Sequence, residues 1–146
     1  MIELHGWVTI RETYEAVFEE ENRIDLLVDK IRKAIDRLSW FKPEIHAQNG
    51  EYFINFSYFS NRMNPQTQEI FDLFGTIGEI AKGSYGLIYL YNDEDSNGRE
   101  NEFQVFSLNR GIVKEGADPF LSPIIPTLED KDIVEFKTEI WESEVE

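Results

Sequence analysis

The feature that most constrains this chain is the segment from Gly83 to Asp95, which reads GSYGLIYLYNDED. An apolar and aromatic run follows a glycine-containing turn and passes without a break into three consecutive acids. A strand of this kind persists only if Leu87, Ile88 and Leu90 are buried, whereas the acids must lie in water or against a cationic partner. One segment therefore joins core to acidic surface, which is typical of a protein that binds something basic.

The N-terminal part of the chain predicts one strand and one long helix. Residues 3 to 12 alternate between apolar and polar types, as a half-buried strand does. Thr13 is the expected N-cap of a helix in which apolar residues recur every three or four positions as far as Leu38. Acids come early in this helix and bases come late, so the helix dipole already explains these charges. Pro43 then ends the helix.

A hairpin and a second helix follow. Asn49-Gly50 separates two apolar runs, residues 44 to 47 and 51 to 59, and Asn-Gly in this position is the strongest short signal of a β-hairpin. Asn64-Pro65 reads as the N-cap and first residue of a second helix, which extends to near Gly83.

The strand that starts at Gly83 is expected to turn through residues 96 to 99 and to pair with residues 102 to 108. The partner strand alternates in type, so its side chains divide between the two faces of a sheet. Phe103, Val105 and Ser107 share one face, and Gln104, Phe106 and Leu108 share the other.

This order predicts an α+β fold in two layers, with a mainly antiparallel sheet and both helices on one face. The elements run β-α-β-β-α-β-β, and the first six resemble a ferredoxin-like arrangement. A proline-rich connector at residues 118 to 126 follows Gly111, and alternation at residues 133 to 141 predicts an extra C-terminal strand. We interpret residues 1 to 146 as a single domain whose acidic end, after about residue 141, frays.

Charge and composition exclude several classes of partner. The chain has 29 acids and 14 bases, a formal net charge of −15, which argues against nucleic acid and against an anionic membrane surface as partners. It has no cysteine, no apolar run of membrane-spanning length and no signal peptide, so we expect a soluble, cytoplasmic protein. Acidity alone keeps such a protein soluble, and a basic macromolecular partner explains the imbalance equally well.

No catalytic or metal-binding pattern stands out. The two histidines, His5 and His46, have no nucleophile motif around them, and nucleotide-binding glycine motifs are absent from the sequence. Asp93-x-Asp95-x-Asn97-Gly98 matches the first half of a calcium loop, but Gln104 stands where a bidentate glutamate should close it. We therefore expect neither a metal nor a cofactor.

Aromatic residues on two of the predicted strands exceed what one buried face requires. Most must belong to the core, and the surplus tyrosines can line an exposed patch, because tyrosine beside acids is a common composition of protein interfaces. These residues are Tyr52, Phe53, Phe56, Tyr58 and Phe59 on one strand and Tyr85, Tyr89 and Tyr91 on the other.

Four motifs occur in order between the first strand and about Asp130. They are LHGWVTI at residues 4–10, GSYGLIYL at 83–90 with the acids that follow, FxVFxLxRG at 103–111, and DPFLSP at 118–123. Together they resemble the immunity protein 7 family of bacterial polymorphic toxin systems. The resemblance implies a small cytoplasmic α+β protein that neutralises a toxin by binding, with no enzymatic activity and no cofactor. Within these motifs, Trp7, Phe103, Phe106 and Phe120 are expected in the core rather than in contact with the toxin.

Our interpretation is a non-catalytic immunity protein whose acidic surface covers a basic toxin domain, for which a nuclease is one candidate. The expected contact surface is the acidic hairpin that follows Tyr91, with this tyrosine as its apolar anchor. Its carboxylates are Asp93, Glu94, Asp95, Glu100 and Glu102. The rival surface is the cluster of acids at residues 19 to 21.

Two other functions stay open on the sequence. One is a small acid/base hydrolase that uses His5 or His46 with a nearby carboxylate. The other is a protein-interaction module unrelated to toxins. A pocket that holds both a histidine and a convergent carboxylate would favour the enzyme.

Overall fold

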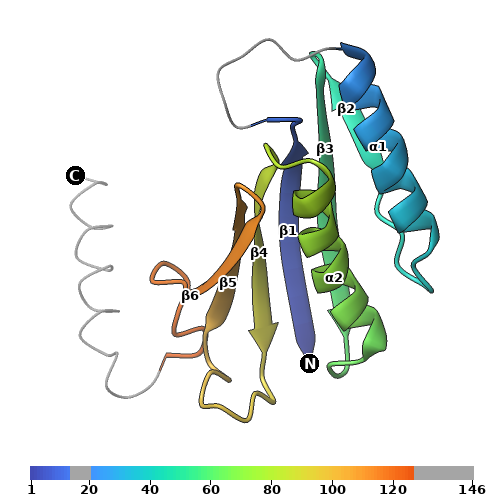
Figure 1. Ribbon diagram of the computed structural model, residues 1–146. Helices are drawn as coiled ribbons and strands as arrows, with labels where there is room; N and C mark the ends of the chain where they lie inside the picture. Colours follow the sequence, from blue (N-terminus) through green and yellow to red (C-terminus); the bar gives the residue numbers. More distant parts are fainter. Residues whose placement is uncertain (14–20, 127–146) are drawn as a thin grey trace, which may run out of the picture.

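The structure, a computed structural model, describes residues 1–13 and 21–126 (Figure 1). These residues contain six strands and two helices. In chain order they are β1 (Ile2–Ile10), α1 (Glu21–Asp36), β2 (Ile45–Gln48), β3 (Glu51–Ser60), α2 (Pro65–Ile80), β4 (Tyr85–Asn92), β5 (Phe103–Asn109) and β6 (Ile112–Ala117).

The strands form one antiparallel sheet in the order β2-β3-β1-β4-β5-β6. Strand β3 lies between β1 and β2, which is the split arrangement that a ferredoxin-like β-α-β-β-α-β order produces. Strands β5 and β6 then extend the sheet beyond β4. The predicted α+β fold with an antiparallel sheet is confirmed.

Both helices lie on the same side of the sheet (Figure 1), and the core fills the space between them and the strands. Alternate strand residues supply one wall of this core because successive side chains in a strand point to opposite faces. The fully buried members include Leu4, Val8, Ile54 and Ile88 from the sheet, and Ile31, Ile70, Phe74 and Ile77 from the helices.

Local signals in the sequence account for two of the boundaries. Asn49 and Gly50 both have positive φ, 53° and 78°, as the predicted two-residue turn between β2 and β3 requires. Asn64 caps α2, since its side-chain Oδ1 accepts a hydrogen bond from the Thr67 backbone N–H at 2.9 Å, and Pro65 is the first helical residue. Both predictions are confirmed.

Strand β6 was not expected, because the sequence after Gly111 reads as the start of a connector. The chain instead reverses at Arg110 and Gly111, which have φ of 53° and 76°, and Ile112–Ala117 pairs with β5. Arginine rarely adopts positive φ, so turn composition does not reveal this hairpin. The prediction of a β-α-β-β-α-β-β order was therefore one strand short.

Two further predictions fall outside the described residues. They are the first turns of the first helix, at residues 14 to 20, and the strand and frayed end expected after residue 132. They stay predictions.

Candidate functional site

The loop between β4 and β5 holds the predicted acidic hairpin in a compact turn. The Asp95 carboxylate accepts hydrogen bonds from the backbone N–H groups of Asn97 and Arg99, at 2.9 and 3.1 Å. The Asn92 side chain accepts one from the backbone of Glu94 at 3.0 Å. Because Asp95 serves the turn itself, it is a structural acid more than a free one.

Arg99 ties this loop to β6. Its guanidinium donates hydrogen bonds to the carboxylates of Glu102 and Glu115 and, at 3.0 Å, to the carbonyl oxygen of Gly116. The hydrogen bond to Glu102 is the main cause that raises the pKa of Arg99. The hairpin is therefore cross-linked to the edge of the sheet, and the Glu102 carboxylate is paired within it.

The remaining predicted site residues differ in their freedom. Asp93 pairs with the N-terminal ammonium group of Met1. Glu94 and Glu100 are exposed, and no ion pair of theirs occurs within the residues that the structure describes. These two are the carboxylates that the hairpin leaves available.

Tyr91 does not reach the surface as expected of an anchor. Its side chain is only 7% exposed, and its ring lies 5.9 Å from that of Phe103. The tyrosine supports the base of the hairpin from inside and does not offer its ring to a partner.

The side chains of the calcium-like pattern, Asp93-x-Asp95-x-Asn97, are not arranged as metal ligands. The Asp95 carboxylate accepts hydrogen bonds from backbone N–H groups. The side-chain oxygen of Gln104 accepts one from the Arg99 guanidinium at 3.4 Å. Over residues 1–13 and 21–126, no group of three or more histidine, aspartate or glutamate side chains could hold a metal ion.

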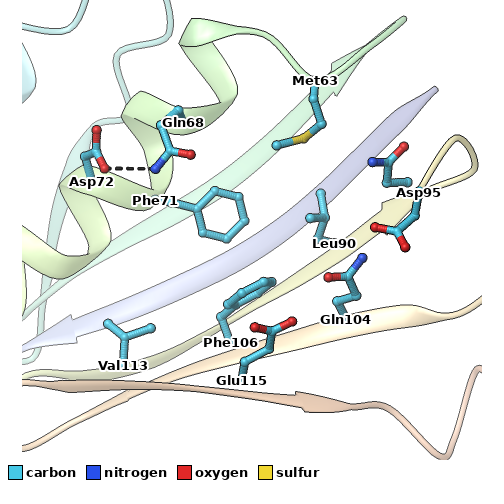
Figure 2. Close-up of a pocket in the computed structure, with 11 residues that line it drawn as sticks. Met63, Gln68, Phe71, Asp72, Leu90, Asp95, Gln104, Phe106, Val113 and Glu115 are labelled. Atoms are coloured by element: carbon cyan, nitrogen blue, oxygen red, sulfur yellow. Dashed lines mark hydrogen bonds between the residues drawn. The ribbon is translucent and has the colours of Figure 1, made fainter. Parts of the chain in front are cut away.

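A cleft opens beside the hairpin on the helix side of the sheet, between α2 and the strands β4, β5 and β6. Figure 2 shows Phe71, Leu90 and Phe106 as its apolar floor, with the two phenyl rings edge to face at 4.8 Å. Its volume is about 510 Å³. Three carboxylates stand around this floor: Asp72, Asp95 and Glu115. An apolar floor under an acidic rim suits the aliphatic stem and cationic head of lysine or arginine.

The opposite side of the sheet, away from the helices, carries a group of aromatic side chains among polar ones. Register places Trp7 opposite Leu87 and His5 opposite Tyr89, so these side chains share one surface. We call this surface the open face and define it by His5, Trp7, Phe59, Tyr85, Leu87 and Tyr89. Edge-to-face ring contacts link Trp7 to Tyr85, at 6.0 Å, and His5 to Phe59, at 5.5 Å.

Two residues that were expected in the core lie on the surface instead. Trp7 is 38% exposed and Phe120 is 86% exposed. The expectation was wrong because both helices cover the other side of the sheet, whereas Trp7 belongs to the open face. Phe106 does pack against the core, and Phe103 is half-buried.

The histidines lie on different strands, His5 on β1 and His46 on β2, with β3 between them. The His5 ring nitrogen Nε2 lies 2.9 Å from the carboxylate of Glu3, and the His46 ring stacks on Phe53. The His5–Glu3 pair lies on the open face and does not line the cleft beside the hairpin. A histidine and a carboxylate thus meet on a partly exposed surface.

Sequence reasoning missed the cleft and the cross-links made by Arg99. Glu115 belongs to the strand that was not predicted, and the bond between Asp93 and the N-terminus joins residues 92 positions apart. No local pattern announces contacts of this kind, since they depend on how the strands are ordered in the sheet.

Comparison with known proteins identifies the family. No curated protein and no solved structure matches the chain, and none of the helices among the described residues is long and apolar enough to cross a membrane. The model of the immunity protein 7 family matches residues 1–130, which include all four motifs of the sequence and every described element. The chain therefore belongs to the immunity protein 7 family.

Proposed function

We propose that this protein neutralises a basic toxin domain, such as a nuclease, by binding it with the acidic hairpin and without catalysis of its own. Membership of the family implies an immunity protein of a toxin system. The expected place of action is the cytoplasm. The net charge of −15 disfavours an anionic membrane surface, and the sequence has no feature that would favour a membrane.

The observation that carries the proposal is the rigid presentation of Glu94 and Glu100. Both sit in a loop held by Asp95, Arg99 and the N-terminus, so that little conformational entropy is lost when the loop binds. Exposed carboxylates speed the encounter with a cationic surface, and they can occupy the place of phosphate in a nucleic-acid site.

The second candidate, an acid/base hydrolase, rests on the 2.9 Å contact between His5 and Glu3. A general base needs a substrate pocket that excludes water and orients the reacting group. The pair lies on a partly exposed surface, with side chains 44% and 29% exposed. Toxin binding therefore explains more features of this protein than a hydrolase activity does.

The test is co-purification of the full chain with the toxin domain encoded beside its gene, followed by growth rescue of cells that express this toxin. The variant E94Q/E100Q removes two free charges at constant shape. The matched control E44Q/E79Q removes two exposed charges elsewhere. We expect the hairpin variant to lose about 1–3 kcal/mol of binding free energy if these carboxylates are desolvated in the complex, and the control to lose much less.

Failure of the wild-type protein to bind or to rescue would refute the proposed function. Equal affinities of the two variants would instead move the interface away from the hairpin.

A further inference from the structure

The open face has the composition of a binding surface rather than of a solvated one. It carries a tryptophan, two tyrosines and a phenylalanine, of which Trp7, Tyr85 and Phe59 are 38%, 41% and 57% exposed. Tryptophan and tyrosine are enriched among the residues that contribute most to binding free energy. A contiguous aromatic patch of this kind on one side of a sheet marks an interaction site.

A hollow of about 320 Å³ deepens this surface between β4, β5 and the turn after β6. Leu87 and Tyr89 line it from the sheet, and Phe120 stands at its wall. Asp118 holds this turn, since its carboxylate accepts hydrogen bonds from the backbone N–H groups of Phe120 and Leu121. The hollow can therefore receive a side chain without rearrangement of the turn.

We propose that the open face is the apolar centre of the toxin interface, with the acidic hairpin as its polar rim, and that the toxin meets it with an arginine-bearing surface. This inference rests on the proposed function and deepens it. Phe103 connects the two parts, because it lies half-buried on the side of the sheet that carries the open face and follows the hairpin in sequence. An apolar centre with a charged rim is the usual anatomy of a specific interface.

Charge selects a basic occupant over the two others that the face could take. A second copy would bring together two chains that each carry −15. The segment 127–146 of the same chain has eight acids and two lysines, a formal charge of 2 − 8 = −6. Like charges disfavour both. A cationic partner is attracted instead, and arginine stacks favourably on the faces of tryptophan and tyrosine rings.

The test compares matched tryptophans in the full chain. W7T removes the aromatic centre of the open face and keeps a residue suited to a strand. W40T removes another exposed tryptophan, 67% exposed, between α1 and β2. Binding is measured against the recombinant toxin domain encoded beside the gene. We expect W7T to weaken binding about 30-fold or more, and W40T to leave it within about 3-fold of wild type.

The variant N55R provides a check that does not depend on the loss of a packed ring. Asn55 is exposed on the same surface and pairs with Trp7 across the strands, so an arginine there adds bulk and positive charge with little effect on the core. We expect an unchanged melting temperature and a loss of toxin binding at least as large as that of W7T.

If W7T and N55R both bind the toxin as tightly as the wild type does, the inference is overturned while the proposed function stands. A wild-type dimer that W7T dissociates, with toxin affinity unchanged, would assign the face to a second copy. A melting temperature that falls in both variants while toxin affinity stays at the wild-type value would assign it to the chain itself. Absence of toxin binding by the wild type would refute the proposed function instead.

Discussion

The two faces of the sheet are built from the same strands but carry different side chains. On β1, Leu4 and Val8 are fully buried beneath the helices, whereas Trp7, on the other face, is 38% exposed. Both helices cover one side of the six-stranded sheet, and the open face carries exposed rings, those of Trp7, Phe59 and Tyr85. Strand alternation therefore separates the core face, which the helices cover, from a face that we propose meets the toxin.

The sharpest test of this division is to truncate one phenylalanine on each face. Phe74 is fully buried in α2, so F74A should destabilise the protein by about 3–5 kcal/mol, through lost burial and the cavity left behind. F59A, on the open face, should cost about 1 kcal/mol or less, because Phe59 is 57% exposed. Urea denaturation measures both, and equal costs would show that the open face is as necessary to folding as the core.

Asparagines allow a second comparison with a smaller effect. Asn64 caps α2. Its side-chain oxygen accepts hydrogen bonds from Thr67 and from the phenol of Tyr58. N64A should cost about 1–2 kcal/mol. Asn55 is exposed opposite Trp7, so N55A should change stability by about 0.5 kcal/mol or less. Thermal and urea unfolding measure both changes. A larger loss of stability in N55A than in N64A would contradict this expectation.

Tyr52 provides a pH-dependent test of the helix-covered side. Its phenol donates a hydrogen bond to Asp25 of α1 at 2.9 Å, and this bond is the first cause that raises the pKa of Tyr52. A raised pKa means that the folded state favours the neutral phenol. The resulting stabilisation is fully present below the unfolded pKa of about 10 and is lost as pH rises through the folded value.

The variant Y52F should therefore be slightly less stable than wild type at neutral pH, by less than about 1 kcal/mol because the pair is near the surface. The difference should vanish at strongly alkaline pH. Y85F on the open face is the control. A Y52F deficit that persists unchanged through the alkaline titration would contradict this account of the bond.

The smallest expected effect concerns metal. Asp95 already accepts two backbone hydrogen bonds and Gln104 cannot chelate in the bidentate way that calcium loops require. A chelator should therefore leave the melting temperature of the purified protein unchanged. A marked drop would mean that the hairpin holds an ion and that its acids are organised by it.

Sequence patterns predicted those parts of the fold whose causes are local. The Asn49-Gly50 turn and the Asn64 cap each depend on a few adjacent residues, and both were predicted correctly. The hairpin after Leu108 was missed because Arg110 takes a positive φ that its type rarely adopts.

The candidate site was less predictable, for a different reason. Alternation shows which strand residues share a face but not which face the helices cover, so Trp7 was misplaced in the core. Likewise, nothing near Arg99 in the sequence shows that Glu115 would bind it, and nothing near Asp93 shows that Met1 would. Such pairs exist only once the sheet is assembled.

The proposed neutralisation of a basic toxin by binding can be tested by the rate at which the protein associates with the toxin domain encoded beside its gene. Exposed carboxylates such as Glu94 and Glu100 act at long range, and ions screen them over about 8 Å at physiological salt. The account predicts a complex whose association rate falls steeply as ionic strength rises, while E94Q/E100Q associates more slowly and with less dependence on salt. Absence of a complex, or an association rate indifferent to salt, would contradict it.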